Sequence, residues 1–243
     1  MIKLLKKYIR PIIRMFGLDI VRYNKKRKFP PDFDESDIRI YNTMKDFTKT
    51  NFETVDALIQ TVKYIVNNKI DGSFVECGVW KGDSIMTMAL ALKELRDRKR
   101  DIYLYDTFSG MVEPTKIDFS YNGQTMQRGM YCSPLEEVKK NVYSTGYPNE
   151  KFHFIEGKVE DTLPKNSPGK IALLKLDTAW YESTKHELIH LYPFISNKGV
   201  IIINFYGDWL GTKKAVDEYI SENNICILLN RVGDSCRIGL KIL

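Results

Sequence analysis

The sequence predicts an α/β fold, in which a doubly wound and mostly parallel sheet ends in an antiparallel hairpin and a helical extension precedes it. Between residues 52 and 223, apolar segments of strand length alternate with segments of helical periodicity, which is the pattern of parallel strands joined by crossover helices. Two more strand-like segments, 225–231 and 235–242, follow with a tight turn between them and predict the hairpin. The length of 243 residues and the apolar content of 43% suit one domain with an extension.

Each element of the expected domain, which we place at residues 48–243, follows from its local pattern. The first helix is expected over 52–68, because Val55, Leu58 and Val62 recur at helical spacing. Strands are expected where apolar runs of strand length occur, at 73–78, 101–108, 151–157, 170–177 and 198–206. Helices are expected between these strands, at 84–98, 134–146, 183–195 and 212–223. Residues 110–133 are polar, contain glycine and lack periodicity, so they predict a long loop.

The net charge of +6 is concentrated in the first 28 residues. They contain ten Lys and Arg residues and one acidic residue, Asp19, which gives +9 and leaves 6 − 9 = −3 for the rest of the chain. A nucleic-acid-binding protein would carry its basic patch on the folded domain, so we expect no nucleic-acid partner. We therefore assign residues 1–47 to a basic arm and linker.

The arm also carries apolar residues near helical spacing. They are Leu4, Leu5, Tyr8, Ile9, Ile12, Ile13 and Phe16, with Pro11 as an interruption. In one interpretation this helix lies on an anionic membrane surface, which attracts its Lys and Arg residues. In the other, its apolar side packs on a second subunit of a homo-oligomer. The sequence leaves both interpretations open.

Other features of the chain indicate a cytoplasmic protein, with membrane association only through the arm. No apolar run approaches the roughly 18–20 residues that span a bilayer. The N-terminal segment lacks the long apolar region and the small-residue cleavage site of a secretory signal. The cysteines at 77, 132, 226 and 236 are widely spaced and form no CxxC pair, so we expect reduced thiols.

Acidic residues and glycines gather where the expected strands end, which is the edge at which open α/β sheets bind ligands. The first strand runs into FVECGVWKGDS, in which Glu76 precedes Gly78 and Gly82. This segment is neither GxGxxG nor a P-loop, so it favours a cationic or hydroxyl-rich ligand over a phosphate. Asp106 ends the second strand, 30 residues after Glu76, where an acid can bind ribose hydroxyls.

Two further acids continue this series, because Asp161 follows the third strand and Asp177 ends the fourth. A single acid at a strand end is often a helix cap. Four acids in chain order instead fit a nucleoside ligand that lies across the sheet, with Asp177 at its reacting end. That is the arrangement of S-adenosylmethionine in class I methyltransferases, which have a Rossmann-like fold.

Five segments in order resemble the macrocin-type sugar O-methyltransferases of antibiotic and polysaccharide pathways: FVECGVWKGDS, YLYDTFSGMVEPT, GKVEDTLP, LDTAWYESTKHELIHLYPFISNKGVIII and GTKKAVDEYI. The resemblance implies a class I methyltransferase fold and the transfer of a methyl group from S-adenosylmethionine to a sugar hydroxyl. By position it implies a cofactor site formed by Glu76, Gly78, Val79, Trp80, Gly82, Ser84, Asp106, Thr107, Val159, Asp161 and Asp177. The segment before Phe52 and the loop 110–133 would cover the substrate.

The sequence departs from the family pattern where a divalent metal, usually magnesium, is bound. The family pattern has Asp-x-Asp at the fourth strand and Asp-Asp after the fifth. Here Asp177 is followed by Ala179, and the second pair is replaced by Asn204 and Phe205. One carboxylate of four remains, and magnesium depends on hard oxygen ligands. The sequence therefore predicts that tight metal binding has been lost.

The sequence leaves the proton acceptor open. Asp177 is the first candidate, His186 lies on the helix after the fourth strand, and Asp208 follows the fifth strand. An acceptor that is already ionised, such as a phosphate or a carboxylate, needs no base, because positioning supplies much of the rate of methyl transfer.

Three functions are compatible with these patterns. The first is an S-adenosylmethionine-dependent O-methyltransferase for a sugar hydroxyl of a glycan precursor or nucleotide-linked sugar, in surface polysaccharide or natural-product biosynthesis. The second is metal-independent methylation of a phosphate or carboxylate. The third is a partner subunit that binds the cofactor and has lost catalysis.

Overall fold

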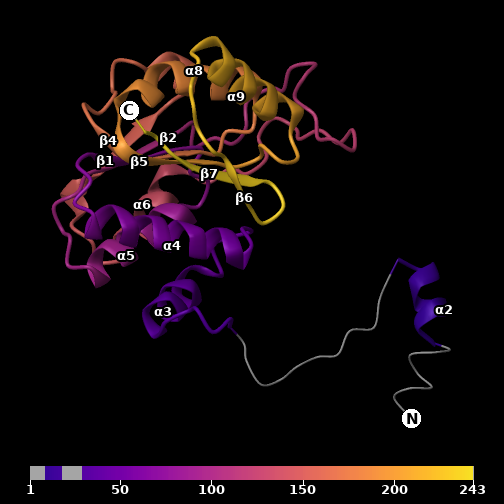
Figure 1. Cartoon of the computed structure of the whole chain (residues 1–243), viewed down its shortest axis with the longest axis horizontal. Helices are drawn as coiled ribbons and strands as arrows, with labels where there is room; N and C mark the ends of the chain where they lie inside the picture. The colour runs from indigo at the N-terminus through magenta and orange to yellow at the C-terminus, as the bar shows by residue number, and fades with distance from the viewer. Residues whose placement is uncertain (1–8, 18–28, 243) are drawn as a thin grey trace. The chain divides into compact units, whose positions relative to one another are not determined.

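The structure, a computed structural model, describes residues 9–17 and 29–242 (Figure 1). The chain divides into two compact units, Met1–Asp34 and Glu35–Leu243. The first unit contains the short helix α2 (Arg10–Met15), with Pro11 in its first turn. A backbone N–H at that position has no partner within the helix, so proline loses no hydrogen bond there. The arm residues Leu4, Leu5 and Tyr8 lie outside the described residues.

The second unit is built around a seven-stranded sheet of order β3-β2-β1-β4-β5-β7-β6. Its strands are β1 (Ser73–Cys77), β2 (Ile102–Asp106), β3 (Phe152–Glu156), β4 (Ile171–Leu176), β5 (Ile195–Ile203), β6 (Asn230–Val232) and β7 (Cys236–Leu240). The pairs among β1 to β5 are parallel, and β7 is antiparallel to both β5 and β6. The expected doubly wound sheet with a closing antiparallel hairpin is thereby confirmed.

Helices cover both faces of this sheet (Figure 1). On one face lie α4 (Phe52–Asn67), α5 (Asp83–Glu94) and α6 (Leu135–Tyr143) together with α3 (Glu35–Met44). On the other face lie α8 (Tyr181–Leu191) and α9 (Leu210–Glu222). The short helix α7 (Val159–Thr162) and the 3₁₀ turns η2 (Asn149–Lys151) and η3 (Tyr192–Phe194) complete the described elements. Two apolar cores, one on each side of the sheet, follow from this layering.

Helix α4 shows how local sequence determines an element. Asn51 is its N-cap, and the Asn51 side chain accepts a hydrogen bond of 2.9 Å from the Thr54 amide. Its apolar positions, including Val55 and Val62, are buried as the helical spacing predicts. The long loop expected at 110–133 is also found, with only an isolated bridge between Ser120 and Trp209.

The compact unit begins earlier than the sequence predicted, at Glu35 rather than at residue 48. The reason is helix α3, which buries Ile40 and Met44 against α4 and α5. It also buries Asp37, whose carboxylate lies 2.6 Å from the Lys63 ammonium on α4. This acid is neutralised by a residue distant in sequence, so local periodicity did not reveal the helix.

The last strand pair is shorter than expected, because residues 225–229 do not pair with a neighbouring strand and β6 spans only Asn230–Val232. Ile225, Ile227 and Leu229 still pack on the apolar core of the α8–α9 face. Their alternation therefore reflects burial of every second side chain rather than ladder hydrogen bonds.

No described helix is long and apolar enough to cross a bilayer. All four cysteines are free, with Cys77 and Cys236 buried and the other two exposed.

Candidate active site

A cavity of about 450 Å³ opens at the carboxyl ends of the parallel strands, where open α/β sheets bind their ligands. Eight of the residues expected at the site line it: Gly78, Val79, Trp80, Asp106, Thr107, Val159, Asp177 and Asp208. The segment before α4 contributes Lys49 and Asn51, and the loop 110–133 contributes Met111 and Tyr131. Both segments expected near the substrate thus reach the cavity.

The turn after β1 requires glycine at position 78. Gly78 has φ +85°, and a Cβ on it would lie 2.5 Å from the backbone oxygen of Asp177. The ends of β1 and β4 therefore approach more closely than any side chain permits. This contact brings the glycine turn next to the backbone of Asp177.

Asp106 holds the same turn from the neighbouring strand. Its Oδ2 accepts hydrogen bonds from the amides of Val79 (2.6 Å) and Trp80 (3.0 Å). Its Oδ1 accepts one of 2.8 Å from the amide of Phe108. A carboxylate has about four acceptor positions, so three are used by the backbone and one is left for a ligand hydroxyl.

Strained backbone follows four of the strands that end at this cavity. Trp80, Phe108, Ala179 and Phe205 each have φ between +48° and +69°, and each lies two or three residues after the end of β1, β2, β4 or β5. Left-handed backbone is unfavourable for residues with a Cβ, and such residues cluster at functional sites. The strain therefore supports a binding role for these strand ends.

Five of the residues expected at the site do not line the cavity: Glu76, Gly82, Ser84, Asp161 and His186. Gly82 is the N-cap of α5 at φ +86°, where a Cβ would lie 3.0 Å from the Val142 side chain on α6. Ser84 is buried behind it, in the first turn of α5. Both residues support the turn by packing.

Neither Asp161 nor His186 lines the cavity, although His186 lies on the helix after β4 as predicted. Asp161 is exposed on α7, whereas its neighbour Glu160 lines the cavity and accepts a 2.7 Å hydrogen bond from Ser183. The ring of His186 lies 4.3 Å from the ring of His190, between ring centres, on α8. The acid after β3 that lines the cavity is thus Glu160, because the helical turn of α7 directs adjacent side chains to different sides.

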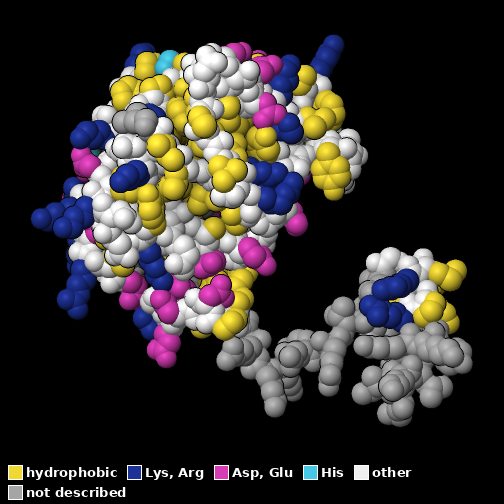
Figure 2. Space-filling view, in the orientation of Figure 1, with side chains coloured by type: hydrophobic (Ala, Val, Ile, Leu, Met, Phe, Trp, Pro, Cys, Tyr) yellow, Lys and Arg dark blue, Asp and Glu magenta, His cyan; other side chains and the backbone are white. Residues whose placement is uncertain are grey.

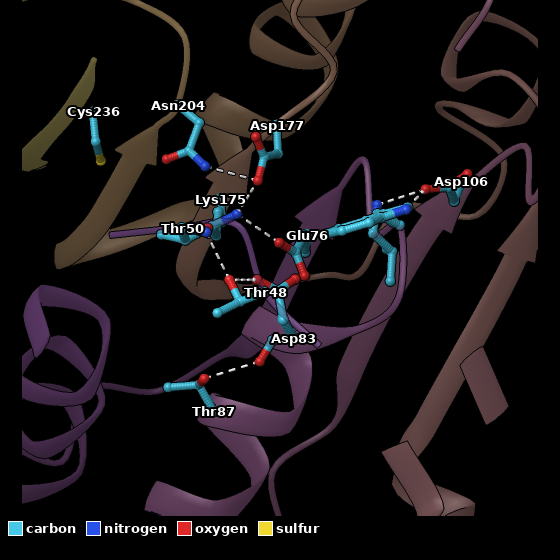
Figure 3. A network of polar contacts seen from close by, with 12 residues as sticks. Thr48, Thr50, Glu76, Asp83, Thr87, Asp106, Lys175, Asp177, Asn204 and Cys236 are labelled. Atoms are coloured by element: carbon cyan, nitrogen blue, oxygen red, sulfur yellow. Dashed lines mark hydrogen bonds and ion pairs between the residues drawn. The ribbon is translucent and has the colours of Figure 1, made fainter. Parts of the chain in front are cut away.

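Glu76 lies beneath the cavity, where it meets a residue that sequence reasoning missed, Lys175 (Figure 3). Glu76 and Lys175 are register partners in the parallel β1–β4 pair, so their side chains lie side by side. The Lys175 ammonium donates to Glu76 Oε1 at 2.7 Å, and the two side chains are 2% and 1% exposed. The lysine inside the apolar run IALLKLD could have indicated a buried ion pair, since a buried lysine is rarely found unpaired.

The same ammonium also forms a short hydrogen bond with Asp177 Oδ2. Asp177 follows Lys175 by two residues, so both side chains project from the same face of the sheet. Asn204 stands at the end of the adjacent strand β5 and donates its Nδ2 to the same oxygen at 2.8 Å. No donor from the described residues is found on Asp177 Oδ1, and Figure 3 shows this oxygen pointing away from the network.

The network continues towards α5 and the segment before α4 (Figure 3). Asp83 is buried at the start of α5 and accepts a 2.5 Å hydrogen bond from the Thr48 hydroxyl. Burial raises the pKa of Asp83, and it raises the pKa of Glu76 to about 8 although the charge of Lys175 opposes this. Burial alone would lower the pKa of Lys175, but the charges of Asp177 and Glu76 raise it. The ammonium is therefore charged at neutral pH.

Residues 32–238 match the macrocin-O-methyltransferase family. The chain belongs to the macrocin O-methyltransferase family. Its relatives include the 8-demethyl-8-(2,3-dimethoxy-alpha-L-rhamnosyl)-tetracenomycin-C 4'-O-methyltransferase of Streptomyces olivaceus, 31% identical over 65% of this chain. The match spans 62% of the length of that relative. The demethyldecarbamoylnovobiocin O-methyltransferase of Streptomyces niveus is 30% identical over 73% of this chain and 69% of its own.

Solved structures of O-methyltransferases share the fold. The O-methyltransferase NovP superimposes with a TM-score of 0.74 at 26% identity, over 81% of this chain and 82% of that chain. The calicheamicin methyltransferase CalS11 superimposes with a TM-score of 0.63 at 19% identity, over 92% and 99%. The Streptomyces achromogenes O-methyltransferase TomG, solved in complex with SAM, has a TM-score of 0.53 at 11% identity, over 96% and 97%. Membership of a methyltransferase family implies S-adenosylmethionine as the methyl donor.

The side chains around Asp177 do not fit the divalent metal that the family resemblance implies. Asp177 Oδ2 already accepts from Lys175 and Asn204, and Asn204 presents its amide nitrogen to it. Phe205 has no ligating atom, and Ala179 is buried in an apolar cluster with Trp180 and Trp209. Among the described residues, no group of three His, Cys, Asp or Glu side chains is arranged to hold a metal. The donor set is that of an ammonium-bound carboxylate.

The side chain of Asp208 also lines the cavity. Burial raises its pKa, and its Oδ1 is buried without a hydrogen-bond partner among the described residues. The backbone oxygen of Asp208 accepts from the Tyr121 amide at 2.9 Å, which joins the loop 110–133 to the end of β5. Asp208 therefore lines the cavity with unused hydrogen-bonding capacity.

Proposed function

We propose that this chain transfers a methyl group from S-adenosylmethionine to a hydroxyl of a sugar. The observation that carries the proposal is one cavity in which the glycine turn, Asp106 and Asp177 are held together by three adjacent strands. Family membership supports the reaction class. The names of the relatives support a sugar or glycoside acceptor, since one acts on a rhamnosyl group.

The residues at the ends of β1 and β2 fit the methyl donor. The Gly78 turn leaves room for close backbone approach, and Asp106 has one acceptor position left for a ribose hydroxyl. Thr107, Val159 and Glu160 extend the same wall of the cavity. S-adenosylmethionine supplies a methyl group on a cationic sulfur when it is bound. A volume of about 450 Å³ lies in the range of small-molecule sites, about 300–1,000 Å³.

An aromatic wall on the opposite side fits the acceptor. Trp180 and Phe205 line the cavity and pack with Trp209 and Met126, and the Trp180 indole donates to the Val112 backbone at 3.1 Å. These rings give a rigid apolar surface for the less polar face of a deoxysugar. The hydroxyl that reacts would then face Asp177.

Asp177 is the group placed to take the hydroxyl proton. Its Oδ2 is held by two donors, and its Oδ1 is left for the acceptor hydroxyl. A fixed carboxylate can both orient that hydroxyl and accept its proton as the new C–O bond forms. Asp208 is the second carboxylate on this side, and its role is tested against that of Asp177 below.

Turnover with nucleotide-linked deoxysugars and their glycosides tests the proposal. We expect S-adenosylmethionine-dependent addition of one methyl group, detected as a mass increase of the acceptor. If only phosphate or carboxylate groups are methylated, the chain is a methyltransferase for acidic groups and not for sugar hydroxyls. Cofactor binding without any turnover would indicate a partner subunit that has lost catalysis.

Removal of the Asp106 carboxylate is expected to weaken cofactor binding about ten- to hundredfold, because a hydrogen bond to a charged group contributes about 1.5–3 kcal/mol. The variant Asp106→Ala also leaves the amides of Val79 and Trp80 without their acceptor. Isothermal titration calorimetry with S-adenosylmethionine measures the change. Asp161→Ala is the matched control, because Asp161 is exposed outside the cavity. Equal affinities of the two variants would contradict the ribose placement.

We also propose that the arm binds an anionic membrane surface. Ile12, Met15 and Phe16 are 57%, 85% and 77% exposed. Figure 2 shows yellow and dark blue side chains side by side on the described part of this unit. An exposed apolar side flanked by basic residues is typical of interfacial helices.

Truncation of residues 1–28 is expected to abolish binding to vesicles that contain anionic lipid and to leave cofactor affinity unchanged. Binding of the full chain should weaken as salt rises, because the attraction is screened within about 10 Å at 0.1 M. Vesicle co-sedimentation measures this, with neutral vesicles as the control. Equal vesicle binding by both proteins would refute the proposal, and a change of oligomeric state on truncation would favour the second-subunit interpretation.

A further inference from the structure

We propose that the Lys175 ammonium is the fixed cation of the reaction centre, which binds and orients Asp177 so that methyl transfer proceeds without a divalent metal. This inference rests on the proposed function and assigns Lys175 as a positioning residue that acts through Asp177.

The position of Lys175 follows from strand register. Lys175 is paired with Glu76 across β1–β4, and Asp177 follows on the same face. Lys175 is 2% exposed, so its ammonium cannot turn outward into water. Two of its three N–H donors are taken by Glu76 and Asp177. The Lys175 ammonium is therefore held in one position by burial and by these two hydrogen bonds.

The surrounding charges explain why this cation is needed. Glu76, Asp83 and Asp177 bring three carboxyl groups close together, and Lys175 is the cation whose charge acts on both Glu76 and Asp83. Like charges that share a site suppress each other's ionisation. Burial already favours the protonated form of Glu76. The ammonium hydrogen-bonds to both Glu76 and Asp177, and of these two carboxyl groups Asp177 is the one that lines the cavity.

The geometry also leaves one oxygen of Asp177 for the substrate. Lys175 on β4 and Asn204 at the end of the neighbouring strand β5 both donate to Oδ2. The carboxylate is thereby fixed in its plane, with Oδ1 directed away from the network (Figure 3). A metal would have to compete with a covalently attached ammonium for Oδ2, so the same contacts that orient the base disfavour a divalent ion.

The principal test is Lys175→Met in the full chain, which removes the charge and keeps much of the side-chain length. We expect kcat to fall about 10²-fold, with the acceptor KM and the cofactor Kd changed less than about threefold. The control is Lys170→Met, because Lys170 lies just before β4 in an exposed ion pair with Asp71. Unchanged kcat in folded Lys175→Met would overturn the proposal.

Two rescue measurements separate positioning from a purely structural role. Methylammonium or ethylammonium should restore part of the activity of Lys175→Ala with saturation, whereas tetramethylammonium, which lacks N–H donors, should not. If Lys175→Met fails to fold, the double variant Glu76→Gln/Lys175→Met removes both ionisable members of the buried pair together and is tested in its place. Failure of rescue in a folded Lys175→Ala variant would count against the proposal.

Two readouts do not depend on turnover. In protein labelled with ¹⁵N-lysine, the Lys175 ammonium should give a slowly exchanging NMR signal that shifts in Asp177→Asn. Electron paramagnetic resonance should show that Mn²⁺ stays free in the presence of the wild-type protein. Tight Mn²⁺ binding, or activity that EDTA removes and Mg²⁺ restores, would overturn the proposal. If no acceptor is methylated, the proposed function fails while these two readouts still decide the state of Lys175.

Discussion

Substitution of Asp177 by Asn is expected to lower kcat about 10²–10⁴-fold, the range that general acid–base groups contribute. Asparagine keeps the size of the side chain but cannot take a proton from the acceptor hydroxyl. It also removes the charge that the Lys175 ammonium binds, so the ammonium is left with Glu76. Cofactor affinity should change much less than in Asp106→Ala, because Asp106 holds the glycine turn whereas Asp177 is proposed to bind the acceptor hydroxyl.

Steady-state kinetics and calorimetry on Asp177→Asn measure both quantities, and Asp208→Asn is the companion variant. Asp208 lines the same cavity but is held by neither Lys175 nor Asn204. We expect the Asp208 substitution to reduce kcat less than about tenfold. If the order of the two effects is reversed, Asp208 is the proton acceptor. Turnover of the wild type should persist in EDTA, since the donor set around Asp177 is not that of a metal site.

Substitution of Gly78 by Ala is expected to destabilise the fold by about 2–5 kcal/mol and to abolish measurable cofactor binding. About 1–2 kcal/mol comes from a Cβ at left-handed backbone, and overpacking adds about 1–3 kcal/mol. The added Cβ would lie 2.5 Å from the Asp177 backbone oxygen and 2.7 Å from its carbonyl carbon. Relief of this clash must separate the ends of β1 and β4, which carry the two halves of the site.

The matched control is Gly123→Ala in the loop 110–133. Gly123 has φ +80°, close to the +85° of Gly78, but a Cβ there would meet no atom within 4 Å. Its substitution should therefore cost only the backbone term, about 1–2 kcal/mol. Urea denaturation compares the two free energies of unfolding. Equal losses would mean that the close approach of β1 and β4 does not constrain position 78.

Much of the fold was predictable because it is encoded over short stretches. Local sequence pattern predicts the helix α4 and each of the strands β1 to β5, and Asn51 is the N-cap of α4. The carboxyl ends of parallel strands share one edge, so Gly78, Asp106 and Asp177 could be assigned to one site before their distances were known.

Local sequence pattern did not predict elements whose buried side chains depend on residues distant in sequence. Helix α3 was missed because its buried Asp37 is neutralised by Lys63, and residues 225–229 were assigned to a strand because alternate burial resembles ladder pairing. Asp161 was preferred to Glu160 because the sequence does not specify how α7 turns after β3.

The sequence alone determined the fold class, the strand ends at which the site was expected and the absence of the family's metal-binding acids, since each depends on residue type and order along the chain. Only the tertiary structure decided what stands beside Asp177. Lys175 and Glu76 are 99 residues apart in the chain, and the parallel register of β1 and β4 places them in contact. A buried charge is stable only with its partner, and register, which arises from the packing of whole strands, determines which partner that is.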